Sequence, residues 1–302
     1  MSYASWGIIL DDIIYPDGQT AMGTLGGGGL YASSGMRLWH KDAAVCAAVG
    51  ADFAASSLTP HGFDNSGLLV TGLPTPRAWQ VLEEDGRRTQ VPRVSSDDWF
   101  EQLVRIPVAQ PIPSTLKAIH FLGRGDEPEE KFVQALAAAG VVISAEPLVD
   151  ENNTAEEIEA LKRCLPYFEL FSPDEFGAKA LVGDRPIKEQ LRALAVLGPR
   201  VVALRQGKDG ALIYEKESDQ FWRVPATAAQ VVDVTGAGNA FCGGLLVGWL
   251  ETKDIRQAAA QASVSAAYVI EQVGPPLINA AVMAAAKTRA AEVVQLIDLV
   301  QE

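Results

Sequence analysis

Cysteine and histidine are scarce in this sequence, and neither is arranged to form disulfides or a metal site. The three cysteines of the 302 residues, Cys46, Cys164 and Cys242, lie far apart and form no CxxC pair. An odd number of widely spaced cysteines does not indicate a disulfide framework, so we expect small buried side chains. The three histidines show no metal-ligand spacing, which argues against a zinc site.

Positive charge is also in short supply. The chain has 25 lysine and arginine residues against 38 aspartate and glutamate residues, which gives a formal net charge of −13. Without a basic cluster to offset that charge, the surface should repel the phosphate backbone of nucleic acids. We therefore expect no nucleic-acid partner.

Long apolar segments and a targeting signal are missing as well. The sequence contains no run of about 18 apolar residues free of charge, and residues 1–12 lack a basic segment followed by an apolar one. These features predict a soluble cytoplasmic protein without a membrane partner. No G-x-x-x-x-G-K-[ST] motif occurs either, which excludes a P-loop nucleotide site.

The sequence does have enough apolar residues for a large core. Hydrophobic residues make up 48% of the chain and charged residues 21%, which is typical of a globular protein. The length would allow two domains, but α/β proteins of this size are often one domain with a small appendage. We predict a single domain over residues 1–302 with a lid.

Short apolar segments alternate with helical ones along most of the chain. Strands are predicted at residues 6–10, 44–49, 118–122, 141–145, 168–172, 201–205 and 210–215. Helices are predicted at residues 128–139, 155–165, 174–181 and 187–197. This alternation is typical of a mainly parallel sheet covered by helices on both faces.

Two segments depart from this pattern and predict a small β lid. Residues 64–91 alternate in polarity around a turn, as a β-hairpin does. Together with residues near 11–23 they would form a small sheet over one end of the domain, so we place the lid at about residues 11–24 and 64–94. Such a lid would exclude water from a reaction site.

The sharpest motif is a glycine-rich turn that opens an apolar helix, at residues 233–239 (DVTGAGN). The unpaired N–H groups of a helix start and its dipole favour an anionic group, and glycines let that group approach the backbone. The alternative is a structural strand-to-helix turn, with Gly243 and Gly244 easing helix packing.

This motif resembles the D-T-x-G-A-G-D signature of the ribokinase-like (PfkB) carbohydrate kinases, in a divergent form that ends in asparagine. The resemblance implies a ribokinase-like three-layer α/β/α sandwich, and ATP-dependent transfer of phosphate to the hydroxyl of a sugar or sugar-like molecule with Mg²⁺. It implies that the backbone of Gly236, Ala237 and Gly238 stabilises the transferring phosphoryl group. It places Asn239 where the family has its catalytic aspartate, and Val234 where threonine is frequent.

Further segments carry the resemblance in family order over nearly the whole chain. Glycines 26–29 are similar to the Gly-Gly motif of the family, which implies that Gly27 and Gly28 contact the sugar. A dinucleotide loop is disfavoured because no G-x-G-x-x-G lies in a clean βαβ unit. Asp12, which we expect at the end of the first strand, occupies the place of the family's aspartate that binds sugar hydroxyls. The adjacent Asp11 leaves that assignment open, and either carboxylate could simply solvate a strand end.

The nucleotide site is implied by a strand, turn and strand at residues 201–214. Gly207 and Gly210 match the family's Gly-x-x-Gly spacing, although a lone G-K-D-G is also an ordinary tight turn. The resemblance adds three nucleotide-binding residues, Arg205, Thr235 and Gly274, the last of them beside the adenine.

The metal site is implied by residues 172–175 (SPDE), which are similar to the N-x-x-E motif that organises Mg²⁺. Glu175 is kept and Ser172 replaces the asparagine. Asp233 belongs to a region that orders the loop and binds a monovalent cation in the family. Alternatively, Ser172 is an N-cap and Glu175 completes a capping box.

Asn239 leaves three hypotheses, because an amide cannot accept a proton as a carboxylate does. Loss of a general base commonly costs about 10²–10⁴ in rate. The chain could be a slow kinase with another base, for which Asp233 is a weak candidate, or a pseudokinase that binds nucleotide or sugar. It could also be a partner-binding protein on this fold. Pairing of two lids into a homodimer is a further expectation.

Overall fold

The computed structural model describes residues 1–84 and 88–301, and a long, mostly parallel sheet runs through it. In the described chain its strand order is β14-β13-β12-β11-β10-β9-β8-β1-β4-β5. The strands are β1 Tyr3–Trp6, β4 Ala43–Val49, β5 Leu68–Val70, β8 Ala118–Gly123, β9 Val142–Pro147, β10 Leu170–Phe171, β11 Val201–Arg205, β12 Ala211–Glu215, β13 Gln220–Val224 and β14 Asp298–Leu299. All neighbours from β5 to β11 pair parallel, and β11 to β14 pair antiparallel.

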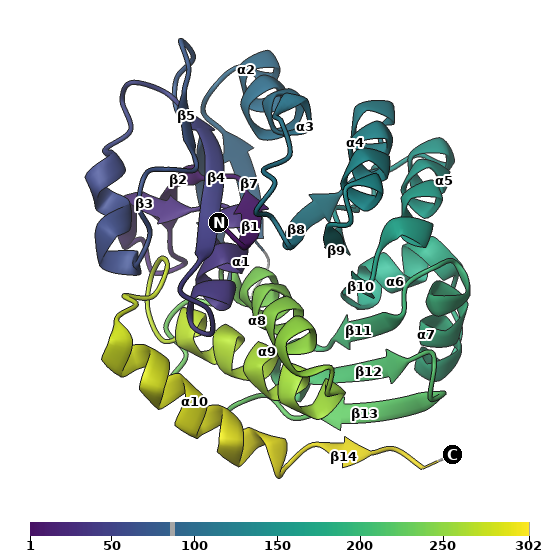
Figure 1. Cartoon of the computed structure of the whole chain (residues 1–302). Coiled ribbons are helices and arrows are strands. Elements are labelled where there is room, and N and C mark those ends of the chain that lie inside the picture. The colour runs from purple at the N-terminus through teal and green to yellow at the C-terminus, as the bar shows by residue number, and fades with distance from the viewer. Residues whose placement is uncertain (85–87, 302) are drawn as a thin grey trace.

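Helices cover both faces of this sheet and make three layers (Figure 1). One face carries α1 Gly28–Arg37, α8 Ala237–Thr252, α9 Ile255–Ile270 and α10 Ala280–Val294, which enclose one hydrophobic cluster. The other face carries α4 Glu127–Ala138, α5 Ala155–Cys164, α6 Glu175–Val182 and α7 Ile187–Val196, around a second cluster. Two short helices, α2 Ser96–Phe100 and α3 Ile106–Ala109, lie between β7 and β8. The predicted sandwich is confirmed.

Local sequence signals start most of these helices. A side-chain oxygen caps the first turn of three helices: Asp126 caps α4, Asp254 caps α9 and Asn279 caps α10. Thr154 and Glu157 form a full capping box at α5. Such caps satisfy backbone N–H groups that have no partner within the helix. In contrast, α1 and α8 begin after glycines and carry no side-chain cap.

A separate sheet packs at one end of the domain, in the strand order β3-β2-β6-β7. Its strands are β2 Ile9–Ile14, β3 Thr20–Gly26, β6 Arg77–Leu82 and β7 Arg88–Pro92. This second sheet is narrower than the predicted lid, because residues 68–70 pair with β4 in the main sheet instead. Residues 85–87 of the predicted hairpin lie outside the described residues.

The predicted strand over residues 6–10 is wrong. Trp6 ends β1 and Ile9 begins β2, which belongs to the second sheet. Gly7 turns the chain between them with φ 116°, a backbone conformation that glycine adopts readily. A continuous apolar run hides this break, because both strands are buried. Within the described residues, no helix is both long and apolar enough to cross a membrane.

Candidate active site

The uncapped start of α8 lies where the carboxyl ends of the parallel strands meet, the usual place for ligands in an open α/β sheet. Gly236 precedes the helix in the left-handed region, with φ 81°, and no side chain caps the first turn. A Cβ at Gly236 would overlap the ring of Tyr31, so only glycine fits there. The N–H of Ala237 donates to the Val234 carbonyl at 3.2 Å.

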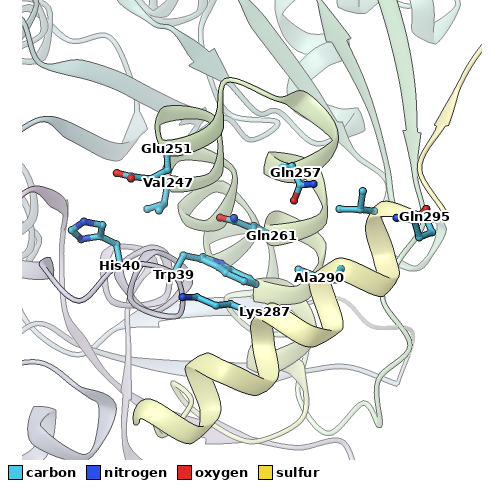
Figure 2. Close-up of a pocket in the computed structure, with 11 residues that line it drawn as sticks. Trp39, His40, Val247, Glu251, Gln257, Gln261, Lys287, Ala290 and Gln295 are labelled. Atoms are coloured by element: carbon cyan, nitrogen blue, oxygen red, sulfur yellow. The ribbon is translucent and has the colours of Figure 1, made fainter.

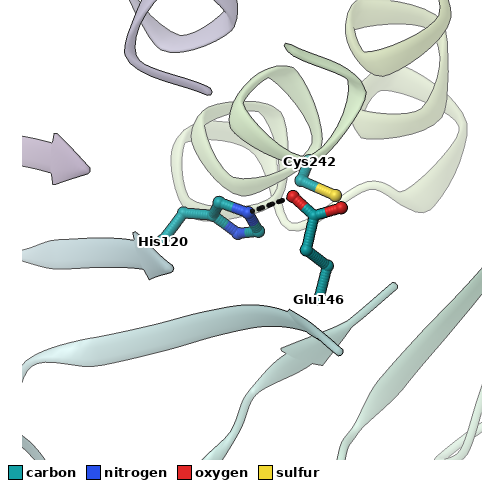
Figure 3. Close-up of side chains that lie close together, drawn as sticks. All are labelled: His120, Glu146 and Cys242. Carbon is teal, nitrogen blue, oxygen red and sulfur yellow. Dashed lines mark hydrogen bonds and ion pairs between the residues drawn. The ribbon is translucent and has the colours of Figure 1, made fainter. Parts of the chain in front are cut away.

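Glu146, at the carboxyl end of β9, is the centre of a buried polar cluster beside this helix start (Figure 3). Its Oε1 accepts from Asn239 Nδ2 at 2.6 Å and lies 3.2 Å from His120 Nε2. Its Oε2 lies 2.8 Å from Arg205 Nη1. His120 Nδ1 in turn lies 2.9 Å from Ser144 Oγ. Residues from β8, β9, β11 and α8 therefore meet at one carboxylate.

The charge state of this carboxylate follows from its surroundings. Burial by itself would raise the pKa of Glu146, but the charge of Arg205 and the hydrogen bonds from His120 and Asn239 outweigh burial and lower the pKa to about 2. Glu146 is therefore ionised and acts only as a hydrogen-bond acceptor. The thiol of Cys242 lies close to His120 and Glu146. Burial, followed by the charge of Glu146, raises the pKa of this thiol to about 12. With no metal bound, that thiol stays protonated at neutral pH.

Arg205, at the end of β11, lies over the first turn of α8. A Cβ at Gly238 would overlap its Nη1, so the guanidinium and the helix start are in close contact. Its Nη2 donates to the Ser172 carbonyl at 2.9 Å. Its Nε is buried and has no hydrogen-bond partner in the described part of the chain. The structure thus brings together Arg205, Gly238 and Asn239, three of the predicted site residues.

Asp233 and Thr235 present unpaired oxygens just before α8. Asp233 Oδ1 accepts from the N–H of Thr235 at 2.9 Å. Asp233 Oδ2 and Thr235 Oγ1 are both buried without a partner among the described residues. A buried polar atom without a partner is costly, so these two oxygens are candidates for contact with a ligand or a cation.

Asp11 and Asp12 point to opposite faces of β2, so their roles differ. Asp12 lies within the second sheet, not at the end of the first strand, and it pairs with Arg93 while accepting from the N–H of Gly23 at 2.7 Å. Asp11 faces inward, because its Oδ1 accepts from the buried Gln80 at 2.8 Å. Its other oxygen lies against Gly26, next to the glycine motif.

The glycine motif lies against the same helix start. Gly27 has φ 99°, and a Cβ there would lie 2.8 Å from the Ile9 nitrogen. A Cβ at Gly28 would lie 3.1 Å from Asn239 Nδ2. The predicted contacts of Gly27 and Gly28 with a sugar stay predictions, but the structure does place Gly28 beside Asn239.

The remaining predicted residues lie outside the cluster around Glu146. Gly207 and Gly210 have φ 56° and 85°, and Gly207 faces open space. Glu175 Oε1 accepts from Gln206 Nε2 at 3.1 Å, which links the metal candidate to this turn. Gly274, with φ 78°, lies near Thr24 of the second sheet.

The capping alternative for residues 172–175 is wrong. Asp174 caps α6 by accepting from the N–H of Gly177 at 2.7 Å. Ser172 Oγ instead donates to the Ala203 carbonyl in the neighbouring strand, at 2.8 Å. Glu175 is therefore not needed for capping, and its assignment to a metal remains a prediction.

Glu146 was not among the residues predicted from the sequence. Glu146 and Arg205 each follow an apolar strand, and the carboxyl ends of these parallel strands meet at one edge of the sheet. A search for polar residues at strand ends would have found both.

A cavity of about 390 Å³ lies at the opposite end of α8 and is distinct from this site (Figure 2). It is lined by Trp39, His40, Glu251, Gln261 and Lys287, among others. Glu251 lies in the last turns of α8, whereas Asn239 lies in the first.

Known proteins share both the sequence pattern and the fold. The family model described as pfkB family carbohydrate kinase matches residues 6–279. A cytidine kinase of Thermococcus kodakarensis is 24% identical over 273 residues, which cover 88% of this chain and 95% of that protein. A nucleoside kinase of Methanothermobacter thermautotrophicus is 27% identical over 281 residues, 88% of this chain and 86% of that protein.

Solved structures show the same architecture. A Burkholderia thailandensis nucleoside kinase in complex with inosine superposes with a TM-score of 0.75 at 20% identity, over 95% of this chain and 98% of that one. A Thermotoga maritima ribokinase gives a TM-score of 0.71 at 16% identity, over 95% and 99%. A Vibrio cholerae fructokinase with fructose, ADP and calcium ion gives 0.75 at 20% identity, over 94% and 97%. The family match over most of the chain, with this fold, shows that the chain belongs to the PfkB family of carbohydrate kinases.

Proposed function

We propose that this protein transfers the terminal phosphate of ATP to a hydroxyl of a sugar-like acceptor, and that a nucleoside is the favoured class of acceptor. The observation that carries the proposal is the uncapped α8 start, with Arg205 over its first turn and the glycine motif beside it. Two relatives that match along most of this chain are named cytidine kinase and nucleoside kinase, and a structural neighbour holds inosine. These names support the nucleoside.

On the nucleotide side, the α8 start and Arg205 supply positive potential for phosphate groups. Backbone N–H groups at residues 236 and 238 and a guanidinium cost little reorganisation when charge develops during phosphoryl transfer. The turn between Gly207 and Gly210 projects beside Arg205, and Gly274 would border the base. Arg205 Nε, buried without a partner among the described residues, is a donor that a phosphate oxygen could use.

The oxygen atoms of three side chains are suitable ligands for a hard cation. Asp233 Oδ2 and Thr235 Oγ1 are buried oxygens without partners in the described chain, and Glu175 adds a carboxylate at the rim. Oxygen ligands of this kind suit Mg²⁺, which when bound would neutralise part of the charge on the phosphates. Asp233 is also the residue that would contact a monovalent cation.

On the acceptor side, the inward carboxylate of Asp11 and the backbone at Gly27 and Gly28 would hold the sugar. Hydroxyl groups donate well to a carboxylate that is partly desolvated. Asp12 pairs with Arg93 on the other face of β2, so the geometry favours Asp11 over Asp12 for this role.

Asn239 limits the expected rate. Its amide can accept a hydrogen bond from the acceptor hydroxyl but cannot take its proton. Phosphoryl transfer has a loose transition state and needs the base less than it needs positioning. We therefore propose a slow kinase, with a rate about 10²–10⁴ below that of an enzyme with a base. A binding protein without transfer is the second candidate, favoured by the same amide.

Thermal unfolding with Mg·ATP tests the nucleotide site first. A ligand at 100 times its Kd adds about 2.7 kcal/mol to the unfolding free energy, which should raise the Tm by roughly 5 °C. Mg²⁺ alone and Mg·AMP are the matched controls. ADP release is then measured with a panel of nucleosides and sugars. Absence of a Tm shift at millimolar Mg·ATP contradicts the proposal, and a shift without ADP release supports the binding protein.

A further inference from the structure

The hydrogen bond between Asn239 and Glu146 fixes the orientation of the Asn239 amide. Glu146 Oε1 lies 2.6 Å from the Asn239 side chain, and an ionised carboxylate can only accept. The atom that faces Glu146 must therefore be the donor, Nδ2. The carbonyl oxygen Oδ1 is left as the part of the amide that can accept a hydrogen bond from a substrate.

Glu146 is held ionised by the groups around it. Arg205 Nη1 lies 2.8 Å from Oε2, His120 Nε2 lies 3.2 Å from Oε1, and the Glu146 side chain is 6% exposed. Arg205 keeps its proton at any accessible pH. The pKa of Glu146, about 2, agrees with a permanent negative charge at this position.

An aspartate in place of Asn239 would face this fixed charge at close range. Two carboxylates that share one site do not both ionise, and one of them retains a proton. A protonated aspartate could not act as a base. The simplest reversion, Asn239→Asp, would therefore not restore a base while Glu146 is present.

We propose that Glu146 is a positioning residue that specifies asparagine at position 239, where the amide orients the acceptor hydroxyl through Oδ1. The asparagine is then matched to its neighbour, and a working aspartate requires removal of the Glu146 charge. The part of this inference that concerns the hydroxyl rests on the proposed function. The part that concerns the Asn239–Glu146 pair rests on geometry alone.

A double-mutant cycle tests the pair without any substrate. Asn239→Asp should lower the Tm at pH 8 by about 5 °C or more, since the introduced carboxyl must either keep its proton far above its ordinary pKa or face Glu146 as a second charge. The decrease in Tm should be smaller at pH 5 than at pH 8. A carboxyl group with a raised pKa keeps its proton in the folded state, so its cost in stability grows as pH rises. Glu146→Gln alone should also lower the Tm, since it removes the partner of the buried Arg205. The Tm loss caused by Asn239→Asp should be much smaller in the Glu146→Gln background than in the original protein, since the introduced glutamine is uncharged and can donate to the introduced aspartate.

Glu169→Gln is the matched control, because Glu169 accepts from Trp249 at 2.8 Å and contacts none of these residues. Combined with Asn239→Asp, it should show no coupling. If Asn239→Asp has the Tm of the original protein at both pH values, or if the Glu146 and Glu169 cycles agree, the inference is wrong.

ADP release separates this inference from the proposed function. The Asn239→Asp, Glu146→Gln double variant should release ADP with a nucleoside at least about 10-fold faster than Asn239→Asp alone. The rate of ADP release by the double variant should rise with pH as the introduced aspartate ionises. A single variant as active as the double one contradicts the inference. If no variant releases ADP while the stability coupling is present, the pair is supported and the kinase proposal fails.

Discussion

Asp11 is the carboxylate whose surroundings suit hydrogen bonding to an acceptor. Burial raises its pKa to about 6, the Gln80 hydrogen bond and the charge of Arg88 oppose the rise, and Asp233 and Asp12 add to it. Because the raised pKa favours the protonated form in the folded state, Asp11 lowers the unfolding free energy as pH rises from about 4 toward 6. Above about pH 6 it is ionised and able to accept from hydroxyl groups.

We expect acceptor binding to weaken below about pH 6 and to depend on Asp11. Asp11→Asn should raise the KM for the acceptor about 10-fold or more, because charge-assisted hydrogen bonds are lost, and should remove the pH dependence of KM. Steady-state ADP release between pH 5 and 8 measures both effects. Asp12→Asn is the comparison: if it raises KM more than Asp11→Asn does, Asp12 binds the acceptor as the resemblance implied.

At the scale of elements, the start of α8 depends on a glycine that no other residue can replace. Gly236→Ala places a Cβ against the Tyr31 ring in a left-handed conformation. We expect the unfolding free energy to fall by about 3 kcal/mol, from backbone strain and overlap together. Urea denaturation measures the change.

Gly140→Ala is the matched control for this substitution. Gly140 has φ 75° but faces open space, so alanine there should cost only about 1–2 kcal/mol of backbone strain. Equal losses at Gly140 and Gly236 would show that the contact with Tyr31 is unimportant. A loss of ADP release in Gly236→Ala alone would link the α8 start to phosphate transfer.

The elements that local signals define were predicted to within about a residue, and those that depend on distant contacts were not. The helix predicted at residues 155–165 is observed as Ala155–Cys164, because Thr154 and Glu157 cap it locally. The turn at Gly7 and the cluster around Glu146 depend on which strands become neighbours. The DVTGAGN motif located the helix start, and Arg205 on β11 was among the predicted site residues, but the contacts of Asn239, Glu146 and His120 could be identified only in the folded chain.

At the scale of the whole molecule, the second sheet leaves an apolar patch on its outer face. Trp79 lies opposite Val91 and Asp12 in the paired strands, so these side chains share the face away from Asp11 and Gln80. Trp79 is 42% exposed and Val91 is 39% exposed. Large apolar side chains gathered on one face are typical of interaction sites.

The expected homodimer, in which the second sheets of two copies pair as lids, can therefore be tested directly. Sedimentation equilibrium should show a dimer for the original chain and a monomer for Trp79→Glu, because the substitution removes a large exposed apolar side chain from this face and places a charge in the interface. Val196→Glu is the control, since Val196 is an exposed side chain on α7, 78% exposed and far from the second sheet, and its replacement should leave the dimer unchanged. A monomeric original chain, or a Trp79→Glu variant that still dimerises, contradicts pairing through this face. If the two second sheets pair, Trp79 and Val91 are buried in the dimer. Each second sheet would then move over the acceptor only together with its partner, and not as a single free sheet.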